Sequence, residues 1–136
     1  MPLMTWNNKY SVGVEALDHQ HKAFMKVLNE LHAAAIRGQA HEVAGRLFRQ
    51  LSSGSSEHFS AEERLMESIR FPGLAGHRAR HGEFTAKLAD FASRHGKGDS
   101  TVYTPMLYFA RDWLTTHILD EDQQYVRWLS GHGNGK

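Results

Sequence analysis

The sequence contains no cysteine, which excludes disulfide bonds, thiolate metal sites and thiol catalysis. No run of apolar residues approaches the roughly 20 that a membrane span requires. The formal charge of +1 is close to balanced, and no basic tract suggests a nucleic-acid partner. The N-terminus lacks the charged and apolar regions of a secretory signal. These absences predict a cytoplasmic protein with no membrane span and no nucleic-acid partner.

Apolar residues recur with helical spacing in four segments, which predicts an all-α protein. The segments cover residues 17–35, 47–69, 74–91 and 106–117. Gly38 is expected to end the first helix, and Pro72-Gly73 the second. Helices of about 20 residues with short connections predict a single domain over residues 1–136, an antiparallel up-down-up-down four-helix bundle. Residues 1–13 are expected to form an irregular N-terminal arm, and residues 131–136 a frayed tail.

At two places in the sequence, the signals for helix and for loop conflict. Residues 52–56, Ser-Ser-Gly-Ser-Ser, have the composition of a linker, but the apolar register continues through them to His58, so we predict helix. The fourth helix begins between Ser100 and Pro105. Either Thr104 caps it with Pro105 as the first helical residue, or Ser100 caps it with the proline inside the first turn.

Residues 58–81 contain two pairs of candidate metal ligands. His58 and Glu62 are four residues apart, as are His77 and His81, and such pairs share one helix face. The break at Pro72-Gly73 folds the two helices together, so three imidazoles and a carboxylate meet in one space. His21 and His117, which lie on the apolar stripes of the outer helices, extend this set. A single buried histidine is usually a satisfied core residue, but five on apolar faces favour a metal site.

The helix that contains His117 offers two registers. A straight α-helix turns Glu121 inward, whereas a slip of one residue turns Asp122 inward together with a more apolar set, Tyr125, Val126 and Leu129. One extra residue in a helix makes a π-bulge, which is frequent at functional sites. We therefore predict a π-bulge, with local overwinding, between His117 and Asp122.

The spacings resemble those of the hemerythrin family, in particular the single-domain bacterial hemerythrins. Each motif alone is weak, but five histidines and two carboxylates in this order are specific, and the resemblance covers essentially the whole chain. The matching motifs are Asp18-His19-Gln20-His21, His58-Phe59-Ser60-Ala61-Glu62-Glu63, His77-x3-His81 and His117-Ile118-x3-Asp122.

The resemblance implies two non-haem iron ions that bind O2 reversibly, for oxygen storage, transport or delivery rather than for enzymatic turnover. By position, three histidines would hold one iron and two the other, which leaves one iron with an open position for O2. The bridges would be an oxo or hydroxo group derived from water and two carboxylates. The implied ligands are His77, His81 and His117 on one iron, His21 and His58 on the other, and Glu62 and Asp122 across both.

The expected O2 pocket is apolar. Leu114 lies about one turn before His117 and should project toward the site, while Phe59, Trp113 and Ile118 neighbour ligands in the sequence. The family often carries an aromatic residue one turn before the first histidine of the His-Phe-x-x-Glu-Glu motif. Here that position is Gly54, which could leave a small cavity or an access route beside His58.

Two other classes of function stay open. The chain could be a di-iron enzyme that consumes O2, peroxide or nitric oxide, or an iron or O2 sensor or store that acts through a partner protein. Di-iron oxidases of the ferritin-like kind use paired Glu-x-x-His motifs, which this sequence lacks. A histidine-rich centre therefore favours O2 binding over O–O cleavage.

Overall fold

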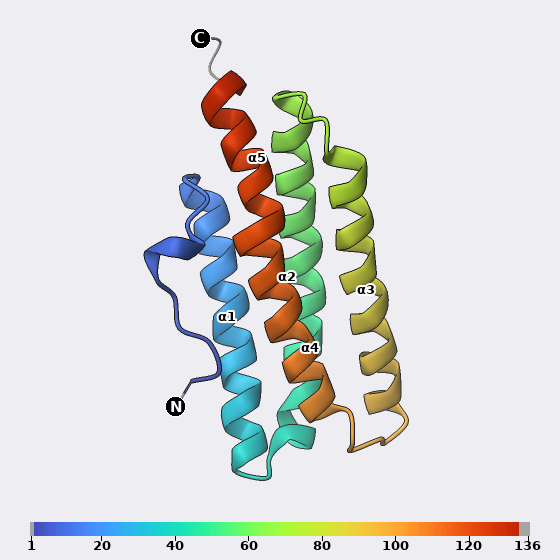
Figure 1. The fold of residues 1–136 in the computed structure, drawn as a ribbon. Coiled ribbons are helices and arrows are strands. Elements are labelled where there is room, and N and C mark those ends of the chain that lie inside the picture. The colour runs from blue at the N-terminus through green and yellow to red at the C-terminus, as the bar shows by residue number, and fades with distance from the viewer. Residues whose placement is uncertain (1, 134–136) are drawn as a thin grey trace.

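The computed structural model describes residues 2–133, and their regular secondary structure is entirely helical. Four rods lie side by side and alternate in direction (Figure 1). The first three rods are α1 (Glu15–Ile36), α2 (Ala40–Ser68) and α3 (Leu74–Gly96). The fourth is continuous and comprises α4 (Tyr103–Thr116), a π-helical turn η2 (His117–Glu121), α5 (Asp122–Trp128) and a second π turn η3 (Leu129–Gly133). The all-α four-helix bundle is thus confirmed.

The helix ends agree with the sequence signals only in part. Gly38 follows α1 with a φ of 72°, and the N–H of Gln39 binds the carbonyl of Ala34, which ends the helix as expected. Helix α2 runs unbroken through residues 52–56. Both predicted caps of the fourth helix are wrong, because α4 begins at Tyr103 after Val102, whose side chain makes no capping bond. Pro105 does lie in the first turn.

The two ends of the chain also differ in part from expectation. Residues 2–14 lie along α1 and contain a short 3-10 turn, η1 (Asn8–Tyr10). Asp18 of α1 anchors this arm, because its carboxylate accepts hydrogen bonds from the Ser11 hydroxyl (2.6 Å) and the Val12 N–H (2.8 Å). At the other end, residues 131–133 belong to the helical turn η3 rather than to a frayed tail. Residues 134–136 lie outside the described residues.

A polar layer divides the interior of the bundle. On one side lies the large apolar cluster that includes Phe24, Phe59 and Ile118, and on the other a small cluster around Leu17, Met66 and Tyr125. Between the two clusters, the inward positions of the helices are occupied by histidines and carboxylates. Among the described residues, no helix combines the length and the apolar character that crossing a bilayer demands. The fold therefore concentrates its unusual chemistry in one buried layer.

Candidate metal centre

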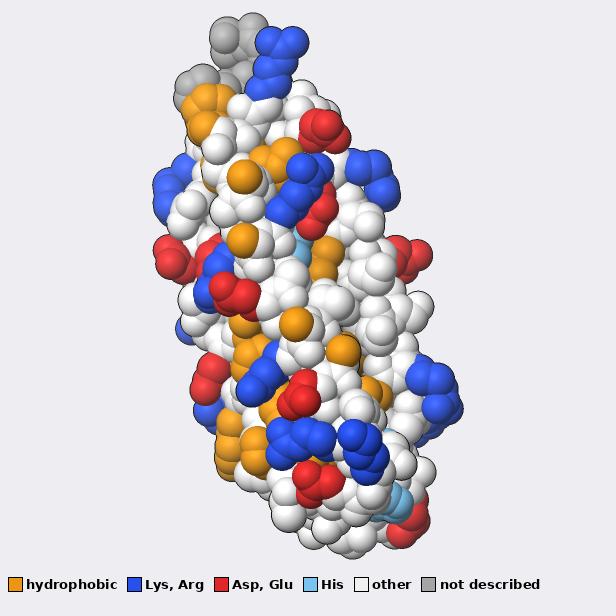
Figure 2. Space-filling view, turned by 90° about the vertical axis from the view of Figure 1, so that its right-hand side faces the viewer, with side chains coloured by type: hydrophobic (Ala, Val, Ile, Leu, Met, Phe, Trp, Pro, Cys, Tyr) orange, Lys and Arg blue, Asp and Glu red, His pale blue; other side chains and the backbone are white. Residues whose placement is uncertain are grey.

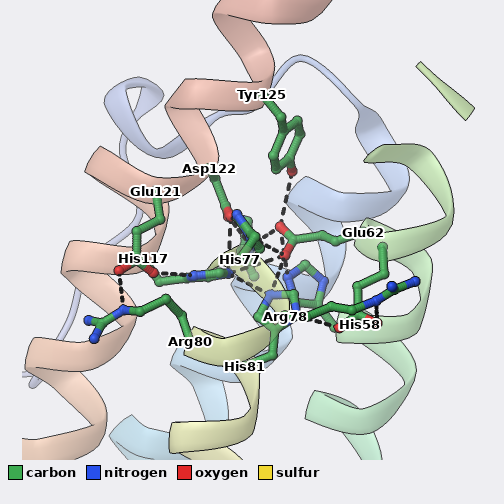
Figure 3. A network of polar contacts seen from close by, with 12 residues as sticks. His58, Glu62, His77, Arg78, Arg80, His81, His117, Glu121, Asp122 and Tyr125 are labelled. Carbon is green, nitrogen blue, oxygen red and sulfur yellow. Dashed lines mark hydrogen bonds and ion pairs between the residues drawn. The ribbon is translucent and has the colours of Figure 1, made fainter. Parts of the chain in front are cut away.

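The structure brings together all seven residues that the sequence suggested as metal ligands. They come from every rod of the bundle, and each side chain is at most 5% exposed. In Figure 3, Glu62 and Asp122 face the imidazoles from opposite sides of a common centre. Helix α1 contributes His21, α2 contributes His58 and Glu62, α3 contributes His77 and His81, and the fourth rod contributes His117 and Asp122.

The two oxygens of Glu62 face different histidines. Its Oε1 lies 3.0 Å from His81 Nε2, 3.1 Å from His117 Nε2 and 3.4 Å from His77 Nε2. Its Oε2 lies 3.3 Å from His58 Nε2 and 3.7 Å from His21 Nε2. A single carboxylate therefore divides the imidazoles into a group of three and a group of two.

Asp122 divides the histidines in the same way. Its Oδ1 lies 3.0 Å from both His77 Nε2 and His117 Nε2, and its Oδ2 lies 3.3 Å from His21 Nε2. Two overlapping groups result, in each of which the potential ligand atoms lie within 4.8 Å of one another. The first group is Glu62, His77, His81 and His117, and the second is His21, His58, Glu62 and Asp122.

The hydrogen bonding of these atoms fits a pair of metal ions. Among the described residues, the Nε2 atoms of His21, His58 and His77 and both oxygens of Asp122 are buried without a hydrogen-bond partner. Their short contacts lack hydrogen-bond geometry, and each buried polar atom left unpaired costs roughly 1–3 kcal/mol. Imidazole nitrogens and carboxylate oxygens are ligands that suit iron. Cations in the two groups would satisfy the atoms that the protein leaves unpaired.

The protonation states favour cation binding. Burial would raise the pKa of Glu62, but the imidazoles packed around its carboxylate, that of His117 above all, hold it well below its ordinary value. Burial and the neighbouring Glu62 raise the pKa of Asp122. Burial, with a contribution from His58, lowers the pKa of His21 to about 3, so its ring is neutral. A metal ion meets an ionised glutamate and neutral rings at His21 and at His77, whose pKa burial also lowers. It would displace a proton from Asp122 and also from the ring of His117, where Glu121 and Glu62 raise the pKa against the effect of burial.

The outer ring nitrogens of three site histidines have hydrogen-bond partners. His81 Nδ1 lies 2.8 Å from Glu63 Oε2, and His117 Nδ1 lies 2.9 Å from Glu121 Oε1, so each ring donates to a carboxylate. His58 Nδ1 lies 2.6 Å from the amide oxygen of Gln20. Such partners fix the tautomer that leaves Nε2 free for a metal. The motif spacings did not predict Gln20 or Glu121 as such partners.

Arginines support the two outer carboxylates. Arg78 Nε donates to Glu63 Oε1 at 3.2 Å, and Arg80 Nε donates to Glu121 Oε2. The sequence does contain a signal for one of these pairs, because Glu121 lies four residues after His117 on the same helical rod.

The π-bulge predicted after His117 is confirmed as the turn η2. The expected overwinding is wrong, because a π turn bonds residues five apart and is wider than an α turn. The extra residue turns Asp122 and Tyr125 fully inward, as the slipped register required. It also leaves Glu121 beside Nδ1 of His117 while Asp122 approaches Nε2 of the same ring.

Aromatic rings cover one side of the site. Phe59 stacks on His81 with ring centroids 3.9 Å apart and 7° between the planes. Trp113 stacks on His117 at 4.5 Å and 19°. Leu114 and Ile118 are buried in the same apolar cluster. The four residues expected to line an O2 pocket thus lie in one buried apolar cluster, and two of them, Phe59 and Trp113, stack on site histidines.

Two cavities approach the site from the surface. One of about 220 Å³ lies between α1 and α2 and is lined in part by Gln20, Phe24 and Gly54, where an added Cβ would meet nothing within 4 Å. The small cavity expected at Gly54 is therefore confirmed, while its use as an access route stays a prediction. The other, of about 650 Å³, lies between α2 and α3 and is lined in part by Phe59 and His81.

Comparison with known proteins gives matches over nearly the whole length of this chain. Residues 12–129 match the family model described as "Hemerythrin HHE cation binding domain". Bacteriohemerythrin of Stenotrophomonas maltophilia (strain R551-3) is 30% identical over 98% of this chain and 86% of that protein. Bacteriohemerythrin of Methylococcus capsulatus (strain Bath) is 32% identical over 96% and 99%, and myohemerythrin of Riftia pachyptila is 32% identical over 88% of each. A crystal structure of wild-type hemerythrin aligns with a TM-score of 0.85 at 31% identity, covering 94% of this chain and 98% of that one. With its buried layer of histidines and carboxylates that can hold two irons, the chain belongs to the hemerythrin family.

Proposed function

We propose that this protein binds O2 reversibly at a non-haem di-iron centre and serves as an oxygen store or carrier. The observation that carries the proposal is the unequal division of the histidines around Glu62. Three imidazoles face one carboxylate oxygen and two face the other. An ion held by two histidines would have one protein ligand fewer, and this would leave room for O2.

The ligand assignment follows the two overlapping groups. His77, His81 and His117 hold one iron, and His21 and His58 hold the other. Glu62 and Asp122 would hold both ions, and a group derived from water would complete the site. The positions of the carboxylate oxygens support this, because in each bridge one oxygen lies beside each group. When bound, the iron pair supplies electrons and an open coordination position for O2.

The surrounding residues orient the ligands and exclude water. Tyr125 donates a hydrogen bond from its hydroxyl to Glu62 Oε2 at 3.0 Å, which fixes the rotation of that carboxylate. Glu63, Glu121 and Gln20 hold three imidazoles through their outer nitrogens. The aromatic wall keeps water and anions away from the centre, and this limits irreversible oxidation.

A binding role rather than an enzymatic one is supported by the relatives, which are named bacteriohemerythrin and myohemerythrin. It is also supported by the ligand set, which is rich in histidine and lacks the Glu-x-x-His pairs of ferritin-like oxidases. Nothing in the geometry specifically favours an enzyme or a partner-dependent sensor. The cytoplasmic location expected from the sequence stays a prediction.

The test is to load the purified protein with ferrous iron without oxygen, count the iron, and then add and remove O2 while the visible spectrum is recorded. Two irons per chain and a reversible visible band are expected. One iron or none would contradict the proposal, and irreversible oxidation with turnover of a reductant would replace it with an enzyme. His21→Ala should lose iron, whereas His19→Ala, two residues away and exposed, should not.

A further inference from the structure

A second cluster of potential metal ligands lies at the end of the bundle where α2 begins, α3 ends and α4 begins. His41 is in the first turn of α2, His95 is in the last turn of α3, and Tyr103 is the first residue of α4. These ends meet beside the α1–α2 and α3–α4 connections (Figure 1). Along α2, His41 precedes His58 by about 25 Å at 1.5 Å per residue. The di-iron centre therefore makes no use of this cluster.

The three side chains converge on one oxygen atom. Tyr103 Oη lies 2.6 Å from His41 Nδ1 and 2.9 Å from His95 Nδ1, and the two imidazole centroids are 4.9 Å apart. A phenolic hydroxyl donates only one hydrogen, so Tyr103 donates to one ring and accepts from the other. Two shared protons thus hold three potential ligand atoms together. A metal ion could take the place of those protons.

We propose that His41, His95 and Tyr103 form a binding site for a single Cu²⁺-like divalent ion. Ligand atoms about 2.0 Å from an ion and at right angles to each other are about 2.8 Å apart, whereas tetrahedral ligands are about 3.3 Å apart. The observed 2.6 and 2.9 Å are hydrogen-bond distances, and they lie nearer to the right-angled separation than to the tetrahedral one. Tetragonal sites of nitrogen and oxygen ligands select Cu²⁺ or Ni²⁺ over tetrahedral Zn²⁺.

The outer nitrogen of His95 can carry the hydrogen that Nδ1 gives up. His95 Nε2 faces Gly45 of α2, where a Cβ would lie 3.7 Å from it. The missing side chain leaves a groove of about 320 Å³ whose lining includes Phe48 and Ser52. Phe48 packs on the His95 ring at 5.5 Å between centroids and so helps to fix its orientation. His41 is exposed, so its outer nitrogen can bind water.

The charged groups beside the cluster are one carboxylate, Asp99, and two arginines, Arg94 and Arg49, so affinity for a cation has to come from the ligand atoms. Burial and the proximity of His41 lower the pKa of His95, so its lone pair is available at neutral pH. Burial and the charge of Asp99 raise the pKa of Tyr103. That carboxylate attracts a cation but also contacts Arg94 at 3.4 Å, and Arg49 lines the groove. Copper must displace the phenolic proton, so binding should strengthen as pH rises.

The test adds Cu²⁺ to the iron-loaded protein, so that the histidine-rich centre is already filled. We expect one Cu²⁺ per chain without loss of iron, an electron paramagnetic resonance signal split by two nitrogens, and a visible phenolate-to-copper band. Tyr103→Phe should abolish the visible band. His41→Ala, at an exposed position, should weaken copper binding at least about tenfold. The control is His19→Ala, which removes an exposed histidine elsewhere and should change neither signal.

A second readout separates ligand loss from misfolding. Copper should raise the thermal unfolding midpoint of the wild type and of His19→Ala, because it ties α2, α3 and α4 together, but not that of His41→Ala. The proposal is overturned if His41→Ala and Tyr103→Phe bind copper like the wild type, or if no stoichiometric copper binds. In the latter case the three side chains are only a hydrogen-bonded contact between helix ends.

Discussion

The outer partners of the site histidines differ in charge. In the group of three histidines, His81 and His117 each donate to a carboxylate, whereas in the group of two His58 donates to the neutral amide of Gln20. The buried Nδ1 of His21 has no hydrogen-bond partner among the described residues. A carboxylate partner makes an imidazole a stronger electron donor. The three-histidine iron should therefore be held more tightly than the other.

Glu121→Gln tests this outer contact. Burial would raise the pKa of Glu121, but hydrogen bonds from His117 and Arg80 lower it, so the side chain is ionised at neutral pH. Its replacement by an amide should weaken iron retention roughly 10–100-fold, measured as iron lost to a ferrous chelator. Glu83→Gln is the matched control, because Glu83 also pairs with Arg80, at 2.7 Å, but touches no site histidine. Equal losses from both variants would show that the contact to His117 is irrelevant.

Leu114→Ala should speed the irreversible oxidation of the oxygenated protein, because a gap in the dry wall admits water. The rate is read from the decay of the visible band. Leu107→Ala removes the same atoms from the same helix about two turns farther from His117. Both substitutions create a core cavity and cost about 2–5 kcal/mol of stability, so only the difference between their oxidation rates reports on the pocket. Identical rates would show that Leu114 does not shield the site from water.

At the scale of elements, the π turn η2 places two consecutive carboxylates beside the two nitrogens of one imidazole. Glu121 lies 2.9 Å from Nδ1 of His117, and Asp122 lies 3.0 Å from Nε2. In a plain α-helix, consecutive residues differ by about 100° in direction and only one could face the ring's inner side. The extra residue swings Asp122 inward while Glu121 keeps its position one turn after His117. The bulge thus supplies an inner and an outer carboxylate from adjacent positions.

Deletion of Asp120, whose side chain is exposed, should convert η2 into α-helix. Asp122 would then be the fourth residue after His117 and would still face inward, while Glu121 would move away from Nδ1. Helical content by circular dichroism should stay close to that of the wild type, and iron retention should fall to the level of Glu121→Gln. Iron loss far beyond that level would mean that the bulge also positions Asp122.

Sequence periodicity predicted most of this architecture, because each helix buries one continuous stripe. It predicted α2 through residues 52–56 and the slip after His117, since both follow from which positions are apolar. It also brought the seven ligands together, because four-residue spacings fix a shared face. It placed the start of α4 correctly between Ser100 and Pro105 but chose the wrong caps, since no side chain caps this helix, and it missed the role of Gln20, which depends on how α1 and α2 pack. Such contacts between helices have no local signal in the chain.

At the scale of the whole molecule, the polar layer crosses the bundle between its two apolar clusters and ties all four rods together. Removal of iron should therefore lower the unfolding midpoint by about 10 °C or more, since each kcal/mol lost shifts it by roughly 4 °C in a chain of this size. Anaerobic reloading with ferrous iron should restore it, as followed by circular dichroism. His21→Ala should respond less, because it lacks a ligand. An unchanged midpoint without iron would contradict the coupling between metal and fold.

The apoprotein should also weaken in mild acid. Burial lowers the pKa of His21 from 6.5 to about 3, so between these values the unfolded chain binds the additional proton. The stability that His21 contributes is therefore complete above pH 6.5 and is lost as pH falls toward 3. Urea unfolding at pH 7 and pH 5 should show a larger loss for the wild-type apoprotein than for His21→Gln. Equal losses would assign the acid sensitivity to other groups.

The turn between α2 and α3 separates the chain into two hairpins, and the ligands divide with it. The first hairpin carries His21, His58 and Glu62, and the second carries His77, His81, His117 and Asp122. Each hairpin holds the histidines of one ligand group. Glu62 of the first hairpin also belongs to the group of three histidines on the second, and Asp122 of the second hairpin belongs to the group of two histidines on the first. A chain cut near Arg70 would thus become two complementary fragments whose association depends on iron. The turn between α2 and α3 therefore links two half-sites covalently, and bound metal would hold the two half-sites together.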